Sequence, residues 1–419
     1  EIMFDLFSGP VVMTSANHYS EPMIHENDAA REKLGSVADE FILHDRAIAN
    51  RCEDAVCAVF GDQTRVFRPG RGVAPVSMPI EVEQSVLAFG ADMKNSFALA
   101  HHGQVTLHPY IGDLAHPETE EILVRSIARQ LDVFHLKPDL IVCDHHPDYF
   151  SSQLARTRAA RDGLPLIETQ HPHAHLVGAC SREAIGFAFD GSGYDDDGTI
   201  WGGVVLRYDA KGFERAFHLR PFALPGGEAA VKHPRRALEA LLYQIDEATN
   251  ADVIEQLERD VNGPLTSSMG RLFDAVSCLL GVCEHPTYDG EAAARLEAIA
   301  DESERGDLAF ELRDHNIDWR PLLVDLLDQC DRGIPAAVLS ARFHNTIAEM
   351  IYCCGKRLAD RHGKRPWVFA GGVFQNRLLV ERITRVVDDE FELIFSAYPN
   401  DGGIAIGQAI IGAKQWASR

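Results

Sequence analysis

The sequence lacks any hydrophobic run long enough to cross a membrane, and no charged-then-apolar leader opens it. Gly or a charged residue breaks the longest apolar runs well short of the roughly 20 residues that span a bilayer. C-x-x-C spacing is also missing, and the nine Cys are scattered. This pattern excludes a disulfide framework and a zinc ribbon and favours buried, reduced thiols. We therefore expect a soluble, cytoplasmic protein with no membrane partner.

Positive charge is scarce, because 40 Lys and Arg oppose 63 Asp and Glu and give a formal net charge of -23. This excess of acid argues against a broad polyanion-binding surface, so we expect no nucleic-acid partner. Hydrophobic residues make up 46% of the chain, which is enough to build a core. A length of 419 residues exceeds one typical core and predicts two or three domains or lobes.

The organisation of the chain changes near residues 68–86, where Pro, Gly and small residues are concentrated. We predict a linker there. Before it, the chain begins at Glu1 and enters directly into an apolar segment, as if cut from a longer protein. After it, short apolar strands alternate with amphipathic helices, which is the pattern of an α/β protein. The predicted helices cover residues 117–135, 234–248, 267–282 and 339–361.

An internal repeat refines this α/β prediction. Residues 86–110 have the pattern of a strand, a Gly/Asp turn, a second strand, another turn and a third strand, and residues 184–208 repeat it. Each unit is followed later by a buried strand that leads into a turn and a helix, at residues 139–149 and 365–383. Two similar lobes with Gly/Asp hairpins are typical of actin-like and sugar-kinase-like ATPases, whose hairpins face the phosphates of a nucleotide.

Three Gly-rich segments are the candidates for a nucleotide cleft: GADMKN at 90–95, FDGSGYDDDG at 189–198 and AGGVFQN at 370–376. Taken alone, the second is equally typical of an ordinary hairpin turn, since Gly and Asp are common there. Together the three favour the cleft, because glycines allow close backbone approach and an Asp can hold a metal or orient water. In the third segment, Asn376 offers a donor and an acceptor to a base.

The segment TQHPHAH is the strongest local signal for a metal. Pro172 is tolerated in the first turn of a helix, so a helix starting here places His171 and His175 on one face and turns His173 elsewhere. Asp401, at a strand-to-helix turn with two following glycines, is the best candidate for a carboxylate ligand. The alternatives are a surface His cluster, and an Asp that only caps the helix after it.

Ten ordered motifs carry a family resemblance: ADMKNSFAL, YIGDL, CDHHPDYFSS, TQHPHAH, FDGSGYDDDGTIWGG, LPGGEAAVKHPRRAL, SSMGRLFDAVSCLLGV, YDGEAAARLE, AGGVFQNRLL and NDGGIAIGQA. They resemble the C-terminal carbamoyltransferase domain of the HypF family of [NiFe]-hydrogenase maturation proteins. The resemblance covers residues 86–419, and VVMTSAN and NRCEDAVCAVFGDQTRVFRPGRGVAP resemble the end of the preceding YrdC-like domain. It implies an α/β YrdC-like part at 1–82 and a two-lobed ATPase fold of duplicated ribonuclease-H-like lobes at 83–419, with lobes of about 83–180 and 181–419.

Site residues carry over from the resemblance position by position. His171, His175 and Asp401 match metal ligands, for zinc or iron, and Asp190 matches an acidic residue important for transfer. The remaining matches are Lys94 and Asn95 in the first hairpin; Gly191 and Gly193 in the second; Asp274, Gly290 and Glu291 on the ribose side; Gly371, Gly372 and Asn376 on the adenosine side; and Ser15, Asn17, Arg51 and Arg68 in the YrdC-like part.

The resemblance implies a reaction in two stages. ATP, with Mg, and carbamoyl phosphate form carbamoyl adenylate, and the carbamoyl group then passes to the C-terminal Cys thiol of a HypE-like partner for cyanide ligand synthesis. The 419 residues depart from the family pattern in RPGRG and EDAV of the YrdC-like part. They also lack the acylphosphatase-like domain, the CxxC zinc fingers and the front half of the YrdC-like domain.

Two other functions remain open from the sequence. One is tRNA threonylcarbamoyl transfer, which related proteins of this fold perform; the acidic charge, the YrdC-like segment and the motifs FDGSGYDDDGTIWGG and LPGG count against it. The other is a non-catalytic module that binds only nucleotide and partner. The presence of His171, His175, Asp190 and Asp401 counts against such a loss of activity.

Overall fold

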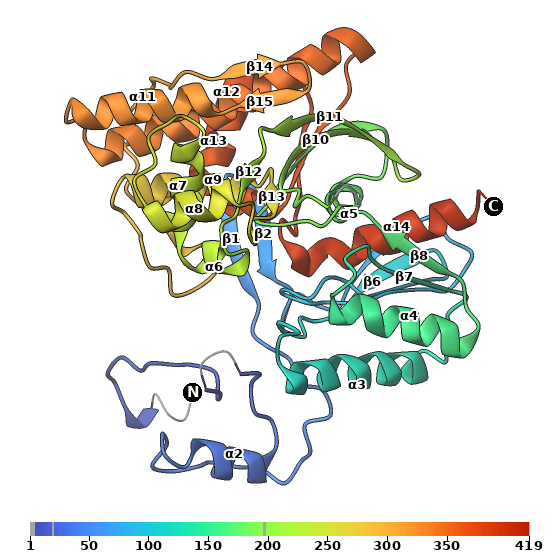
Figure 1. The fold of residues 1–419 in the computed structure, drawn as a ribbon. Helices are drawn as coiled ribbons and strands as arrows, with labels where there is room; N and C mark the ends of the chain where they lie inside the picture. The colour runs from blue at the N-terminus through green and yellow to red at the C-terminus, as the bar shows by residue number, and fades with distance from the viewer. Residues whose placement is uncertain (1–4, 19–20, 196–197, 419) are drawn as a thin grey trace.

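Two β-sheets form the framework of the protein, for which a computed structural model describes residues 5–18, 21–195 and 198–418 (Figure 1). The first sheet has the order β3-β6-β5-β4-β7-β8 and the second has the order β14-β15-β11-β10-β9-β16-β17. The first sheet comprises β3 (Val76–Pro79), β4 (Val86–Ala88), β5 (Ala98–His101), β6 (Gln104–Leu107), β7 (Leu140–Asp144) and β8 (Leu166–Thr169). The second comprises β9 (Ala184–Phe189), β10 (Gly203–Tyr208), β11 (Phe213–Leu219), β14 (Glu311–Arg313), β15 (Asn316–Asp318), β16 (Trp367–Ala370) and β17 (Leu393–Phe395).

The two sheets share one topology. In the first, β4, β5 and β6 form an antiparallel meander, and β4, β7 and β8 pair in parallel. In the second, β9, β10 and β11 repeat the meander, and β9, β16 and β17 repeat the parallel set. The central strands β4, β7, β9 and β16 are buried along their whole length, as expected of strands covered on both faces. The predicted repeat and the two-lobed α/β fold are therefore confirmed.

Two helices lie between the sheets, and each packs on the sheet of the other lobe (Figure 1). Helix α5 (His171–Ala179) packs on β9, β10 and β16 of the second sheet, whereas the last helix, α14 (Ile404–Trp416), packs on β4 to β8 of the first. The two helices touch closely, because a Cβ at Gly407 would lie 1.8 Å from the carbonyl oxygen of Ala174. The predicted lobe division at 180/181 places α5 in the first lobe and α14 in the second. Each helix thus covers the sheet of the lobe to which the division does not assign it.

The outer helices complete the two cores. Helices α3 (Pro117–Val133) and α4 (Phe150–Asp162) cover the outer face of the first sheet (Figure 1). The second lobe carries α6 (Glu228–Lys232), α7 (Pro234–Tyr243), α8 (Ala251–Glu258), α9 (Met269–Leu279), α10 (Glu291–Ala298), α11 (Arg320–Asp331), α12 (Ala336–His362) and α13 (Arg377–Val387). Helices α3, α7, α9 and α12 confirm the four predicted helices, although α7 ends five residues early. No helix within the described ranges is long and apolar enough to cross a membrane.

The predicted linker contains a strand of the first lobe. Strand β3 pairs with β6 at the edge of the first sheet, so the predicted boundary at 82/83 falls after a strand that belongs to the lobe. An edge strand tolerates proline, so Pro79 can end a strand even though the Pro-rich sequence around it predicts a linker.

The part of the chain before β3 holds α2 (Asn27–Leu34) and the hairpin of β1 (Val56–Phe60) and β2 (Gln63–Arg68). A small ladder of β12 (Phe222–Ala223) and β13 (Leu265–Thr266) lies in the second lobe.

Candidate metal and nucleotide site

Helix α5 presents two imidazoles on one face. Gln170 caps the helix, because its side-chain oxygen accepts a hydrogen bond from the His171 amide at 2.9 Å, and Pro172 follows in the first turn. The Nε2 atoms of His171 and His175 lie 3.2 Å apart. His173 points away, with its Nε2 atom 2.6 Å from the Asp209 carbonyl oxygen. The helical spacing therefore separates the three histidines as predicted.

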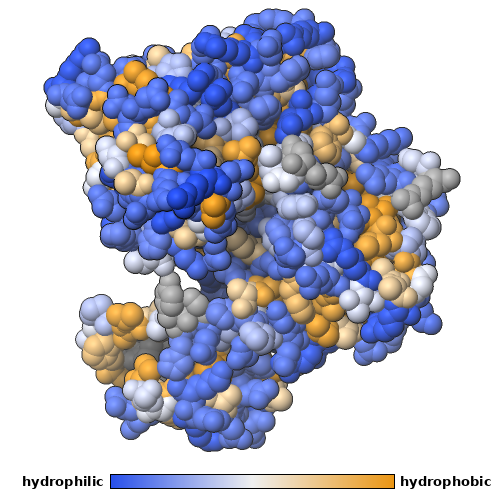
Figure 2. Space-filling view, viewed as in Figure 1, coloured by the Kyte–Doolittle hydropathy of each residue, from blue (hydrophilic) through white to orange (hydrophobic). Residues whose placement is uncertain are grey.

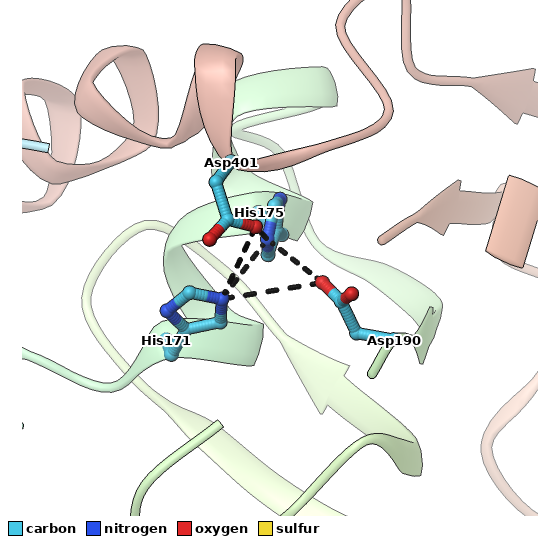
Figure 3. Close-up of side chains that lie close together, drawn as sticks. All are labelled: His171, His175, Asp190 and Asp401. Atoms are coloured by element: carbon cyan, nitrogen blue, oxygen red, sulfur yellow. Dashed lines mark hydrogen bonds and ion pairs between the residues drawn. The ribbon is translucent and has the colours of Figure 1, made fainter. Parts of the chain in front are cut away.

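Two carboxylates face this histidine pair (Figure 3). Asp190 follows β9 in the second hairpin, and Asp401 begins the 3-10 turn Asp401–Gly403 that leads into α14. Asp190 Oδ2 lies 3.2 Å from His175 Nε2 and 4.0 Å from His171 Nε2. Asp401 Oδ1 lies 3.4 Å and 3.7 Å from the same two nitrogens. The four candidate ligand atoms all lie within 4.8 Å of one another.

This set of donors fits a divalent cation. Ligands at about 2.1 Å from a tetrahedral ion are about 3.4 Å apart, and the separations of 3.2–4.0 Å that involve the two histidines bracket that value. Asp190 Oδ2 is buried and makes no well-aligned hydrogen bond among the described residues; its near neighbour is His175 Nε2 at 3.2 Å, so a bound cation would satisfy this oxygen. Two imidazole nitrogens and two carboxylate oxygens suit a borderline cation such as zinc or iron(II).

A third carboxylate orients the first histidine. Asp144, buried at the end of β7, places Oδ2 2.7 Å from His171 Nδ1, and its Oδ1 accepts the His146 amide at 2.9 Å. With Nδ1 engaged, His171 directs Nε2 toward the cluster, as in the carboxylate–histidine pairs behind metal ligands. Sequence reasoning missed Asp144. The available signal was its place at the carboxyl end of a buried parallel strand, where ligand-binding residues collect in such sheets.

Opposite charges within the cluster stabilise one another. Burial disfavours a charged His171, but Asp144 and then Asp401 outweigh burial and raise its pKa well above the usual range. Burial likewise favours a neutral Asp401, but His171 and His175 outweigh it and lower the pKa of this carboxyl well below its usual range. The protons that the histidines hold without a metal are therefore the protons that a metal displaces.

A cleft of about 660 Å³ opens beside the cluster and is lined by residues of both lobes. Figure 2 shows that this face of the molecule is deeply hollowed near its centre. Asp190 and Asp401 line the cleft as well as the cluster, so the two sites share a wall. Of the predicted nucleotide residues, the cleft brings together Lys94, Asp190, Gly191, Asp274, Gly290 and Gly372.

Cations from both lobes reach into the cleft. Lys94, in the β4–β5 hairpin, lies with its Nζ 3.0 Å from Asp289 Oδ2. Burial alone would lower the pKa of Lys94, but Asp289 and then Asp401 outweigh it and raise the pKa. Arg271 of α9 lies with its Nη2 3.0 Å from Asp274 Oδ2, and its Nε is buried with no hydrogen-bond partner among the described residues. Both cationic side chains lie beside the cleft, where a phosphate could bind them.

Asn376 makes structural contacts rather than lining the cleft. Its Oδ1 accepts the Leu379 amide at 2.8 Å and so caps α13, while its Nδ2 lies 2.9 Å from His344 Nε2. Both ends of the amide are thus engaged, and Asn376 is absent from the cleft wall. Its neighbour Gln375 lines the cleft instead and accepts a hydrogen bond from Asn400 at 2.9 Å. The base contact predicted for Asn376 stays a prediction, and this arrangement counts against it, because the helix cap engages Oδ1 and His344 engages Nδ2.

Four other predicted residues support the cleft without lining it. Asn95 is fully buried and donates to the carbonyl oxygens of Phe89 and Ala91 at 3.0 and 2.6 Å, which fixes the first hairpin. Glu291 accepts the Thr287 hydroxyl at 2.9 Å. Gly371 has φ 104°, a conformation that disfavours other residues, and Gly193 packs against Trp201. Asp196 and Asp197 of the second hairpin lie outside the described residues.

The residues predicted for the YrdC-like part lie outside this cleft. Arg51 Nη1 pairs with Glu53 Oε1 at 2.8 Å, and the guanidinium of Arg68 lies 5.3 Å from the centre of the Tyr110 ring. The Ser15 hydroxyl donates to the side-chain oxygen of Asn17. A separate nucleotide site around these residues stays a prediction.

Family models match almost the whole chain. The model of the HypF Kae1-like domain matches residues 81–183, and that of the second subdomain of the Kae1-like carbamoyltransferase domain matches residues 186–408. Residues 1–70 match the Sua5/YciO/YrdC model, described as telomere recombination. These three matches follow the order of the YrdC-like part and the two lobes.

Curated proteins and solved structures give the same result. Carbamoyltransferase HypF of Rhodobacter capsulatus is 37% identical over 100% of this chain and 59% of its own length. A HypF homolog of Cupriavidus necator is 33% identical over 79% of this chain and 92% of its own length. A crystal structure of full-length HypF in a phosphate- and nucleotide-bound form aligns with TM-score 0.91 and 33% identity, over 96% of this chain and 67% of that one. The chain thus spans about six-tenths of the length of the first of these relatives.

Proposed function

The chain belongs to the HypF family of carbamoyltransferases, and from this membership we propose that its cleft transfers a carbamoyl group from carbamoyl adenylate to a thiol. The acceptor is the C-terminal Cys of a HypE-like partner, and the product feeds cyanide ligand synthesis in [NiFe]-hydrogenase maturation. In the full-length enzyme, ATP with Mg and carbamoyl phosphate supply the adenylate. The part of the chain before β3 is assigned to the end of the YrdC-like domain, and β3 with the residues after it to the transferase domain.

One observation carries the proposal: Asp190 and Asp401 belong to both the histidine cluster and the wall of the cleft. A group bound in the cleft beside these two carboxylates therefore lies next to the candidate metal site. A divalent cation held there, zinc or iron, supplies Lewis-acid polarisation of a carbonyl oxygen. Asp144 keeps His171 in the orientation that this requires.

The cations of the cleft are suited to stabilise the negatively charged phosphate of the leaving group, AMP. In the proposed step, a thiolate sulfur bonds to the carbamoyl carbon, the bond from that carbon to the phosphate oxygen breaks, and AMP leaves with the electron pair. Negative charge grows on the phosphate as this bond breaks. Lys94 and Arg271 lie on the cleft wall where they stabilise that charge, which is the electrostatic contribution of fixed cations to group transfer.

The test supplies the donor directly. We expect the 419-residue chain to form a carbamoyl adduct on a HypE-like peptide with a C-terminal Cys when carbamoyl adenylate is provided, as detected by mass spectrometry. With carbamoyl phosphate and ATP alone we expect no adduct, because activation requires a complete YrdC-like site and the release of carbamate. A peptide ending in Ser is the matched control.

Two outcomes would contradict this assignment. No transfer from intact adenylate would favour the alternative of a non-catalytic module that binds nucleotide and partner. Robust turnover from carbamoyl phosphate and ATP by this chain would show that activation uses residues other than those assigned here.

A further inference from the structure

A carboxylate from the second lobe, Asp289, pairs with both cations that are proposed to bind the phosphate, Lys94 and Arg271. Asp289, in the loop before α10, lies with Oδ2 3.0 Å from Lys94 Nζ and with Oδ1 3.9 Å from Arg271 Nη2. Lys94 comes from the hairpin of the first lobe and Arg271 from α9 of the second. The side chain of Asp289 remains 44% exposed, so a ligand can reach it and replace it on either cation.

The rest of the cleft wall adds to this negative charge. Of the five carboxylates on the wall, Asp190 and Asp401 belong to the candidate metal cluster, and Asp274 already holds Arg271 at 3.0 Å. Asp289 is ionised in this setting: burial alone would raise its pKa, but Lys94 and then Arg271 outweigh burial and lower it. Each additional negative charge on a ligand therefore meets fixed carboxylates as well as cations that are already paired.

We propose that Asp289 sets the charge preference of the cleft, favouring a singly charged adenylate ester over polyanionic ATP. This inference rests on the proposed function, in which the ligand is an acyl adenylate with one negative charge on its phosphate. A singly charged phosphate can replace the Asp289 carboxylate beside Lys94 and Arg271 at little cost, because both groups carry one negative charge. A triphosphate displaces Asp289 as well, and its further charges meet a wall whose described cations, Lys94, Arg271 and Lys232, are already paired with carboxylates.

A charge series of ligands tests the proposal by calorimetry in magnesium-free buffer at fixed ionic strength. The ligands are adenosine, adenosine 5′-methylphosphate, AMP and ATP, and wild type is expected to bind the singly charged methylphosphate more tightly than ATP. In Asp289→Asn we expect ATP to bind about tenfold more tightly, AMP about threefold, and the methylphosphate and adenosine less than about twofold. Asp289→Ser should give the same order.

Glu228→Gln is the matched control. It removes one negative charge from the same wall, but Glu228 pairs with Lys232 at 2.8 Å on α6, not with Lys94 or Arg271. We expect it to change each affinity by less than about twofold.

The outcomes separate the two claims. If Asp289→Asn shifts ATP and the methylphosphate by the same factor, or weakens ATP, the charge preference does not come from Asp289. If wild type binds none of the nucleotides, the nucleotide cleft of the proposed function is itself wrong.

Discussion

The two Gly/Asp hairpins share a backbone pattern but have different chemistry. In the first lobe, the hairpin after β4 turns its amide side chain inward, where Asn95 holds the loop, and sends the cation Lys94 into the cleft. In the second lobe, the hairpin after β9 sends a carboxylate, Asp190, to the histidine cluster and leaves glycine beside Arg271. Duplication thus supplies two similar supports, and their side chains divide them into the proposed phosphate side and the proposed metal side.

Removing metal ligands should have the largest effect on this division. We expect His171→Ala or His175→Ala to abolish metal binding, because each removes one of two imidazole nitrogens that face the carboxylates. His173→Ala is the matched control and should keep its metal, since His173 contacts Asp209 instead. Elemental analysis of the purified variants measures this. Equal loss in all three variants would show that the helical face does not select the ligands.

Removing the charged side chain of each hairpin in turn should separate the loss of metal from the loss of nucleotide binding. Asp190→Asn should lower both metal content and transfer, the latter by about a hundredfold or more, because it weakens a ligand of the cluster. Lys94→Met should keep the metal and weaken AMP binding about tenfold, because it removes a cation from the phosphate side. Elemental analysis paired with calorimetry distinguishes them. A loss of metal in Lys94→Met would contradict the division.

Asp144 supports the metal side from behind, so its loss should have a smaller effect. We expect Asp144→Asn to weaken metal affinity about 10–100-fold, because His171 loses the carboxylate that fixes its orientation. Competition with a chromophoric chelator measures the affinity. In the metal-free wild type, Asp144 and Asp401 raise the pKa of His171, so protons should compete with metal and affinity should rise with pH. Unchanged metal affinity in Asp144→Asn would show that Asp144 does not support the metal ligand His171.

One buried histidine in each lobe should make the fold sensitive to acid to a similar degree. Burial lowers the pKa of His108, stacked on Phe97, and of His344, next to Asn376, to about 4 each. Between pH 6.5 and 4 the unfolded chain binds protons that the folded chain refuses, so stability falls as pH falls through this window. The loss is at most about 3 kcal/mol for each histidine.

Urea unfolding at pH 7 and pH 5 tests this expectation. His108→Gln and His344→Gln should each flatten the pH dependence, and Lys94→Met, which removes no histidine, should leave it unchanged. A similar slope in all four proteins would assign the acid sensitivity to other groups.

The sequence by itself determined the features that depend on local spacing. The repeated strand and turn pattern predicted two lobes of one topology, because alternation and turn residues act over a few positions. The four-residue spacing of His171 and His175 fixed their common face, since a helix places residues i and i+4 together whatever surrounds it. The Gly residues after Asp401 predicted a turn that brings a carboxylate to the start of a helix.

Only the tertiary structure decided the contacts between distant segments. Asp144 meets His171 across 27 positions of the chain, and Asp289 meets Lys94 across 195, and neither pairing leaves a local pattern. Asn376 has groups that suit a base, and only the structure shows that the start of α13 and the nearby His344 engage them. Helices α5 and α14 cover each other's sheets because Gly407 lets them cross closely, and a sequence read in order assigns each helix to its own half.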